Sequence, residues 1–156
     1  MRLLPAAALA LLVAVPAFAQ APSPRQAEFA AAAMAPVAPN AKHTPTAGDT
    51  VYFTHKQTYL TKNAVEQVQR QAAWLKKNPA VKVRLECHTD DDFPPEYALS
   101  FGEARCQAVE RVLMKAGVEA GRITAVSYGN QRPAVPNATT KEEHGKNRRV
   151  ITRVVE

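Results

Sequence analysis

Cysteine, glycine and aromatic residues are all scarce in this chain of 156 residues, which has 2 cysteines, 6 glycines and an aromatic content of 6%. The two cysteines are Cys87 and Cys106, so no cysteine stands near the amino terminus to carry a lipid. We therefore do not expect a lipid-anchored amino terminus. Long apolar runs are also missing after the first twenty residues, which argues against a membrane span in the rest of the chain.

The chain is basic, with a formal net charge of +6 and a pI near 9.6. Its lysines and arginines are spread among acids and are not clustered with aromatic residues, which does not favour nucleic acid as a partner. An anionic cell wall or membrane surface is the expected counter-charge.

The first nineteen residues have the pattern of a cleaved signal peptide. Arg2 precedes an apolar run over residues 3–15, and Ala17 and Ala19 give the small-residue pattern before Gln20. The run is too short to span a bilayer, and no stop-transfer pattern follows it. An exported, soluble mature chain is expected, with an uncleaved apolar anchor as the alternative.

Residues 20–48 are rich in alanine and proline and show no strand alternation. Prolines at these intervals interrupt helices, so we predict an extended tether with at most a helical turn around residues 28–34. The alternative is an arm that packs on the domain, which would need more apolar surface to offset the cost of ordering it. The remaining residues, 49–156, form the predicted domain.

The first half of this domain reads as strand, helix, strand. Residues 50–54 are β-branched and aromatic, as in strands. Thr61 is suited to cap a helix running to about Asn78, and Pro79 stops it. Residues 81–87 then alternate, which predicts a half-buried strand with Val83, Leu85 and Cys87 on its inner face and Lys82, Arg84 and Glu86 on its outer face.

The second half adds a helix, a strand, a short helix and a strand. Ser100 and Glu103 form a capping-box pattern for a helix that ends at Gly117. Strands are predicted at 123–128 and 149–155, with a short helix around 140–146. The fold class is therefore α/β: an α+β sandwich of order β-α-β-α-β-(short α)-β, with one mixed four-stranded sheet and two main helices on one face.

Asp90 and Arg105 are the candidate binding pair. The aspartate closes a strand, and the arginine falls in the first turns of the helix predicted to begin near Ser100. Opposite charges at a strand end and a helix start lie side by side and suit a ligand with both an ammonium and a carboxylate. The alternative is an ordinary surface ion pair worth about 0–1 kcal/mol.

No pattern points to an enzyme, a cofactor or a metal. His88 follows Cys87, but strand alternation places the two side chains on opposite faces. Asp90, Asp91 and Asp92 lack the glycine and the distal acid of a calcium loop, so a solvated acidic turn is expected. His43, His55 and His144 show no paired spacing of the kind that zinc sites use.

Three segments carry a resemblance to a known family: QAAWLKKNPAVKVRLECHTD, YALSFGEARCQAVERVLMKAGVEAGRITAVSYGNQRP and KNRRV. The chain resembles the OmpA-like peptidoglycan-binding domain over residues 49–156, and within that family the peptidoglycan-associated lipoprotein branch. The resemblance implies noncovalent binding of the diaminopimelate residue in the peptidoglycan stem peptide.

The same resemblance assigns residues to that site. An aspartate of the HTD segment and an arginine in the next helix grip the ligand in this family, and these are Asp90 and Arg105 here. Thr89 belongs to the same HTD segment. The family's Asn-Arg-Arg segment is Asn147, Arg148 and Arg149, which the resemblance places near the pocket.

The chain also departs from the family pattern. Thr54, His55 and Lys56 stand where the family usually has an alternation of aromatic and acidic residues. Phe93 replaces a glycine in the turn after Asp90, and Ala98 replaces an asparagine. A bulky residue is poorly suited to the positive backbone angle that glycine tolerates, so we expect this turn to take another path that shifts Asp90 or covers the pocket.

Cys87 and Cys106 replace a glycine and an alanine of the family pattern, and both fall on apolar faces. In an exported domain, two cysteines favour a disulfide. The other interpretation is two small buried hydrophobic residues, and the sequence leaves both open because it does not give the Cα separation.

The function expected from these features is a periplasmic module, associated with the cell wall or outer membrane, that binds the peptidoglycan stem peptide. The alternative is a drifted OmpA-like domain that docks on another envelope protein through its basic face. An open pocket at Asp90 favours the first function, and its occlusion by Phe93 and Pro94 favours the second.

Overall fold

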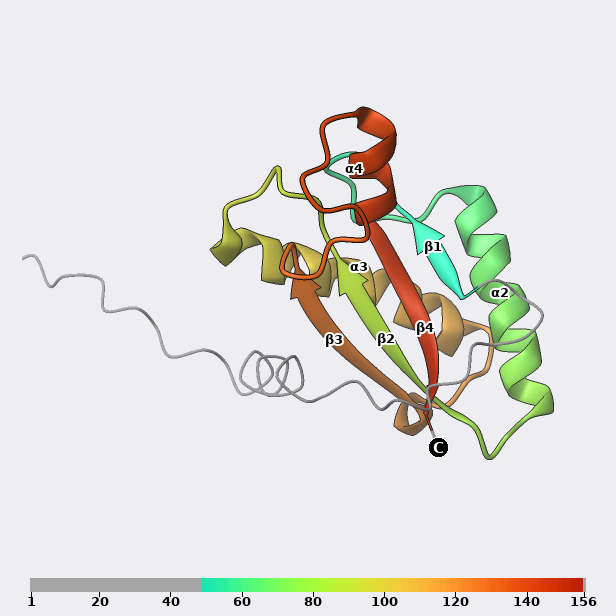
Figure 1. Cartoon of the computed structure of the whole chain (residues 1–156). Helices are drawn as coiled ribbons and strands as arrows, with labels where there is room; N and C mark the ends of the chain where they lie inside the picture. Colours follow the sequence, from blue (N-terminus) through green and yellow to red (C-terminus); the bar gives the residue numbers. More distant parts are fainter. Residues whose placement is uncertain (1–48, 156) are drawn as a thin grey trace, which may run out of the picture.

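The computed structural model of the chain describes residues 49–155. The predicted signal peptide and tether lie outside these residues. The described elements are, in order, β1 (Thr50–Tyr52), α2 (Lys62–Lys77), β2 (Lys82–His88), α3 (Pro95–Lys115), the 3₁₀ turn η1 (Ala120–Arg122), β3 (Ile123–Gly129), α4 (Lys141–Asn147) and β4 (Arg149–Val155). The predicted order of elements is confirmed (Figure 1).

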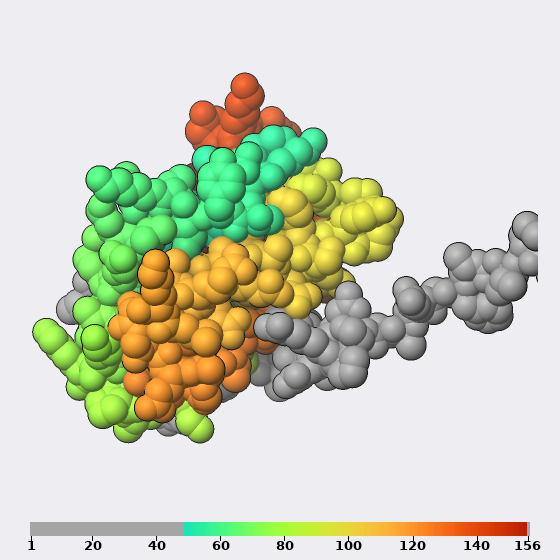
Figure 2. Space-filling model, turned by 180° about the vertical axis from the view of Figure 1, so that it is seen from behind, coloured from blue at the N-terminus to red at the C-terminus, as the bar shows by residue number. Residues whose placement is uncertain are grey.

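The four strands form one mixed sheet in the order β1-β4-β2-β3. β2 and β3 are parallel, whereas β4 runs antiparallel to both β1 and β2. α2 and α3 cover one side of the sheet, and Figure 2 shows this side of the molecule from behind. The predicted sandwich with two main helices on one face is therefore confirmed.

The core lies between these helices and the inner face of the sheet. Val83, Leu85 and Cys87 of β2 are fully buried there, as their alternation predicts. The outer face of β2 is less exposed than expected at its carboxyl end, where Glu86 and His88 are also buried. Glu86 accepts hydrogen bonds from the guanidinium groups of Arg84 and Arg153, and the His88 ring stacks on Tyr128. These contacts bury the outer face of β2 at its end, on the side of the sheet opposite to α2 and α3.

The predicted boundaries of α2 are confirmed. The Thr61 side chain accepts a hydrogen bond from the backbone N–H of Ala64, which satisfies one of the free donors at the helix start. At the other end, Arg122 donates to the carbonyl oxygens of Leu75 and Asn78. The exposed carbonyls of the last turn therefore have cationic partners.

The predicted start of α3 is wrong. The helix begins at Pro95, and Ser100 lies inside it, where its hydroxyl donates to the carbonyl of Tyr97 and caps nothing. Proline fits the first helical position because its missing N–H would have no partner there. Arg105 consequently lies near the middle of α3 and not in its first turns.

The short helix predicted around residues 140–146 is confirmed as α4. Thr140 and Glu143 form a capping box: the Thr140 hydroxyl accepts from the Glu143 N–H, and the Glu143 carboxylate accepts from the Thr140 N–H. This short helix ends at Asn147, and so places Arg148 at the junction between α4 and β4.

Among residues 49–155, no helix is both long enough and apolar enough to cross a membrane.

A disulfide joins Cys87 of β2 to Cys106 of α3, with their Cα atoms 5.7 Å apart. Of the two interpretations that the sequence left open, the structure has the bridge. It ties the central strand to the helix that covers it, and both cysteines are fully buried.

We expect reduction of this disulfide to destabilise the domain. The bond closes a loop with a sequence separation of 19 residues, and in the chain-entropy model such a loop contributes about 3 kcal/mol, or several degrees in Tm. Thermal unfolding with and without reductant measures the change. The Cys87→Ala/Cys106→Ala double variant is the control, because reductant should leave its Tm unchanged. Two free thiols per chain in the unfolded, unreduced protein would contradict the bridge.

Candidate functional site

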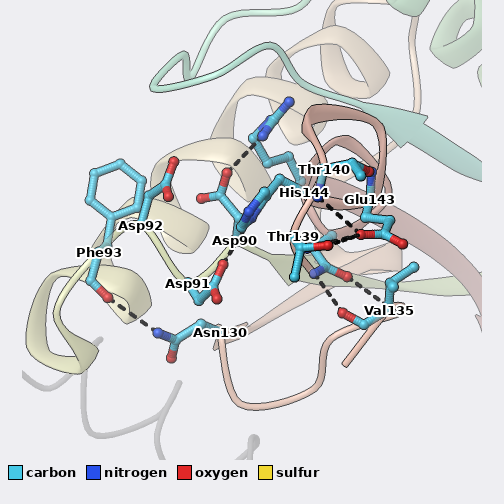
Figure 3. Close-up of polar contacts among 12 residues, drawn as sticks. Asp90, Asp91, Asp92, Phe93, Asn130, Val135, Thr139, Thr140, Glu143 and His144 are labelled. Carbon is cyan, nitrogen blue, oxygen red and sulfur yellow. Dashed lines mark hydrogen bonds and ion pairs between the residues drawn. The ribbon is translucent and has the colours of Figure 1, made fainter. Parts of the chain in front are cut away.

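The candidate site lies at the end of the sheet where β2 stops. The turn that follows β2 carries Asp90, Asp91 and Asp92, and it lies beside α4 and the loop after β1. Figure 3 shows Asp90, Asp91 and Asp92 on this turn, with Asp91 paired with His144 of α4. Segments that are far apart in the sequence therefore contribute side chains to one place.

Asp90 is fully buried and pairs with Arg148. Its Oδ2 accepts a hydrogen bond of 2.8 Å from Nη1 of Arg148. Within residues 49–155, its second oxygen, Oδ1, has no hydrogen-bond partner. A buried carboxylate oxygen without a partner is costly, so this atom is a candidate contact for a ligand.

Arg105 is also fully buried, and backbone carbonyls hold its guanidinium. Nε donates to the carbonyl of Gln57 and Nη1 to the carbonyl of His88, both at 3.0 Å. Nη2 has no hydrogen-bond partner in the described part of the chain. The position of the guanidinium is thus set, while one of its nitrogens stays available.

Two aromatic rings enclose the same guanidinium. Its carbon lies 5.1 Å from the centroid of the Phe53 ring and 5.0 Å from that of Phe101. Burial lowers the pKa of Arg105 to about 10, Asp90 opposes this change and Arg148 adds to it. The group remains protonated at neutral pH.

The interpretation of Asp90 and Arg105 as an ordinary surface pair is wrong, because neither residue is exposed. The hydrogen-bonded partner of Asp90 is Arg148, while Arg105 acts on Asp90 as a nearby charge. The site is therefore one carboxylate between two guanidinium groups. The guanidinium groups suit a ligand carboxylate at Arg105, while Asp91 and Asp92 of the same turn offset their positive charge.

The other residues that the resemblance assigned have different placements. Thr89 is fully buried, its N–H donates to the carbonyl of Gly129, and its hydroxyl has no partner among the described residues. Asn147 is engaged with Val135, since its side chain accepts from that residue's N–H and donates to its carbonyl. Asn147 therefore fixes the loop before α4.

Arg149 lies on the outer face of β4, since its neighbour Val150 belongs to the core. Its guanidinium donates to the carbonyls of Asn147 and Arg132. Arg148 is thus the arginine of this segment that the structure brings to Asp90.

Phe93, in the turn after Asp90, does not take the positive φ that a glycine tolerates. Lys56 and Asn137 are the residues other than glycine with positive φ in residues 49–155, so Phe93 needs no such angle. The Phe93 ring stacks on Phe101 at a centroid distance of 4.4 Å, and its carbonyl accepts from the Asn130 side chain. Because Phe101 lies over Arg105, this stacked pair covers the site.

Sequence reasoning missed two contacts at the rim. Nδ1 of His55 lies 3.0 Å from Oδ2 of Asp92, and Nδ1 of His144 lies 2.9 Å from Oδ1 of Asp91. The one signal in the sequence was that His55 lies in the segment where the family usually has an alternation of aromatic and acidic residues. Spacing could not reveal these pairs because their members come from segments that are far apart in the sequence.

A sequence model of the OmpA family matches residues 52–148. This chain belongs to the OmpA family. It is 38% identical over 103 residues to the peptidoglycan-associated lipoprotein of Haemophilus influenzae, a match that covers 66% of this chain and 67% of that protein.

Solved structures agree with this assignment. The crystal structure of the peptidoglycan-associated lipoprotein from Burkholderia pseudomallei superposes with a TM-score of 0.67 at 28% identity, covering 71% of this chain and 93% of that chain. The C-terminal domain of Helicobacter pylori MotB has the same fold, with a TM-score of 0.60 at 24% identity over 68% of this chain and 84% of that chain.

Burial of the pair changes what we expect of its variants. Removing one member of a buried charge contact costs about 3–5 kcal/mol, so Asp90→Ala and Arg105→Ala should both lower the free energy of unfolding by amounts of this order. Arg111→Ala is the matched control, since Arg111 is exposed on the same helix and should change stability by less than about 0.5 kcal/mol. Urea unfolding measures all three. Equal stability of Arg105→Ala and Arg111→Ala would show that Arg105 is not buried.

His88 should make the domain sensitive to mild acid. Burial, followed by Arg149, Arg132 and Arg153, lowers the pKa of His88 to about 3. Because this lies below the unfolded value near 6.5, stability is complete above about pH 6.5 and falls as the pH drops, by up to about 1.4 kcal/mol per unit.

Urea unfolding between about pH 7 and pH 5 measures this slope, in a range where most carboxylates stay ionised. The His88→Gln variant should show a smaller slope than the wild type. Identical slopes would mean that His88 is not the group responsible.

Proposed function

We propose that this protein is a noncovalent peptidoglycan-binding module of the cell envelope that recognises the diaminopimelate residue of the stem peptide. Membership of the OmpA family and the similarity to proteins named peptidoglycan-associated lipoprotein support this function. The observation that carries it is the pair of unpartnered polar atoms, Oδ1 of Asp90 and Nη2 of Arg105. Oδ1 accepts hydrogen bonds and Nη2 donates them. A ligand that carries both an ammonium and a carboxylate needs one group of each kind.

Each atom has a definite role in this proposal. The ligand ammonium donates to Oδ1 of Asp90, and the ligand carboxylate accepts from Nη2 of Arg105. Arg148 holds the carboxylate of Asp90, while Phe53 and Phe101 enclose the guanidinium of Arg105. The hydroxyl of Thr89 is a further group without a partner in the described residues. Preorganised groups of this kind lose little entropy on binding.

We infer that the protein binds and does not catalyse, because the site holds charges without a nucleophile and base in contact. The predicted signal peptide would place this activity in the periplasm, in association with the cell wall or outer membrane. No cofactor is part of the proposal.

Access to the site requires a movement of the Phe93 and Phe101 rings. Both charged residues are fully buried, so only the fraction of molecules with the ring pair displaced binds the ligand. The apparent affinity is reduced by that fraction. This occlusion is the observation that favours the second candidate, a drifted domain that docks on another envelope protein through its basic face.

Sedimentation with purified peptidoglycan sacculi tests the proposal. We expect the protein to pellet with sacculi at low salt and to be released by free diaminopimelate or a stem peptide. Asp90→Asn and Arg105→Lys should each weaken binding by about 2–5 kcal/mol, because each leaves a ligand charge unpaired. Arg111→Ala should bind like the wild type.

Two results would contradict this function. If the protein stays in the supernatant with intact sacculi, docking on a protein partner becomes the better candidate. If Asp90→Asn and Arg105→Lys pellet as the wild type does, the pocket lies elsewhere.

Phe93→Gly should tighten binding, because it removes the ring that covers Phe101. A larger competent fraction raises the apparent affinity, by at least about threefold if the ring pair limits access. Tyr97→Ala, which removes an exposed ring from the start of α3, is the control and should leave affinity unchanged. Titration with a soluble stem peptide measures both. Unchanged affinity in Phe93→Gly would show that the stacked rings do not obstruct the site.

A further inference from the structure

Two imidazoles and three carboxylates meet at the rim of the site. His55 comes from the loop after β1, His144 from α4, and Asp90, Asp91 and Asp92 from the turn after β2. Their donor atoms form two overlapping groups, His55 with Asp90 and Asp92, and Asp91 with Asp92 and His144. Within each group, all donor atoms lie within 4.8 Å of one another.

The first group has a feature that an ordinary acidic turn lacks. Asp90 is fully buried, and its Oδ1 has no hydrogen-bond partner within residues 49–155. Figure 3 shows the carboxylate of Asp90 lying between Asp92 and the ring of His144. A buried carboxylate oxygen without a partner among the described residues is costly, and a second carboxylate beside it adds repulsion. A bound cation would relieve both.

His55 is presented to this carboxylate pair by its turn. The N–H of Gln57 donates to the carbonyl of Thr54, and Lys56 takes a positive φ of 51°. This tight turn sets Nδ1 of His55 at 3.0 Å from Oδ2 of Asp92. A nitrogen donor thus reaches the two oxygen donors from a different loop.

We propose that His55, Asp90 and Asp92 form a binding site for a divalent transition-metal ion of the zinc class. One imidazole nitrogen and two carboxylate oxygens make a three-residue donor set that leaves a coordination position for water. The imidazole favours zinc, nickel or copper over calcium or magnesium, which prefer oxygen ligands only. Zinc bonds of about 2.0–2.1 Å place tetrahedral donors about 3.3 Å apart, so the exposed turns would close slightly on the ion.

The charges around the donor set are balanced enough to accept this ion. Asp90 and Asp92 supply two negative charges, and Asp91 adds a third in the same turn. Arg148 and Arg105 act against a cation, but Arg148 is bound to Oδ2 of Asp90 and leaves Oδ1 to the metal.

The metal and the stem peptide therefore exclude each other. This step rests on the proposed function, because the ion would occupy Oδ1 of Asp90, the oxygen assigned to the diaminopimelate ammonium. Occupation by zinc would release the protein from the wall. Metal binding itself is independent of that function.

Calorimetric titration of the purified protein with zinc chloride tests the site. We expect one ion per chain, no displacement by calcium, and binding weakened more than about tenfold in His55→Ala and in Asp92→Asn. The His144→Ala variant is the matched control, since it removes an imidazole from the same rim but not from the proposed set. Thermal melts of all variants check that each is folded.

Three outcomes overturn the proposed site: no zinc binding by the wild type, full binding by His55→Ala and Asp92→Asn, or loss of binding in His144→Ala with His55→Ala unaffected. The last result would move the ion to Asp91, Asp92 and His144.

A competition experiment separates the two proposals. Zinc should lower the affinity for a soluble stem peptide in the wild type but not in His55→Ala, and simultaneous binding of both would overturn the exclusion. If zinc binds while no stem peptide or sacculus does, the wall-binding function fails and the metal site stands.

Discussion

The buried guanidinium of Arg105 is the constraint on which this end of the molecule depends. A charge removed from water must be given partners, and here they come from three separate segments. Gln57 and His88 supply carbonyl oxygens, while Phe53 and Phe101 enclose the group on two sides. The arginine thereby ties the end of β1, the end of β2 and the middle of α3 into one arrangement.

The disulfide reinforces the same contact. Cys87 and Cys106 are the immediate chain neighbours of His88 and Arg105, which are joined by a hydrogen bond of 3.0 Å. The covalent bridge and this hydrogen bond therefore hold adjacent points of the strand and the helix. The bridge buries two residues in the core while it limits how far Arg105 moves relative to the end of β2.

Charge balance is the basis of the selectivity that we propose for this site. One carboxylate, Asp90, stands between two guanidinium groups, and only Arg148 is hydrogen-bonded to it. The unpaired atoms on Asp90 and Arg105 have opposite hydrogen-bonding character. A ligand with both an ammonium and a carboxylate satisfies them together, whereas a metal ion at Asp90 satisfies the carboxylate alone.

Departures from the family pattern change the rim and leave the pair in place. Phe93 avoids the positive φ of glycine and stacks on Phe101, which covers the guanidinium. His55 lies in the segment where the family usually has an alternation of aromatic and acidic residues, and it contacts Asp92. The rim of the site thus has a stacked ring pair and an imidazole that contacts an aspartate.

Local pattern was enough to determine the elements of this protein and most of their limits. Thr61 and Pro79 mark the ends of α2, Thr140 and Glu143 cap α4, and alternation identifies the inner face of β2, because these signals act between residues close in the chain. The start of α3 was misjudged, since a proline pair suits a helix start as well as the pattern at Ser100 does.

The residue pattern selected Asp90 and Arg105 and the resemblance to a family assigned the same pair, but the sequence did not show how they are held. Only the tertiary structure decided that Arg148 is the partner of Asp90, that Arg105 is buried between two rings, and that His55 and His144 reach the acidic turn. Most of these contacts join residues from segments that are far apart in the sequence, and no local periodicity records which segments the fold brings together. The packing of these distant segments decides which side chains are buried and which charges pair.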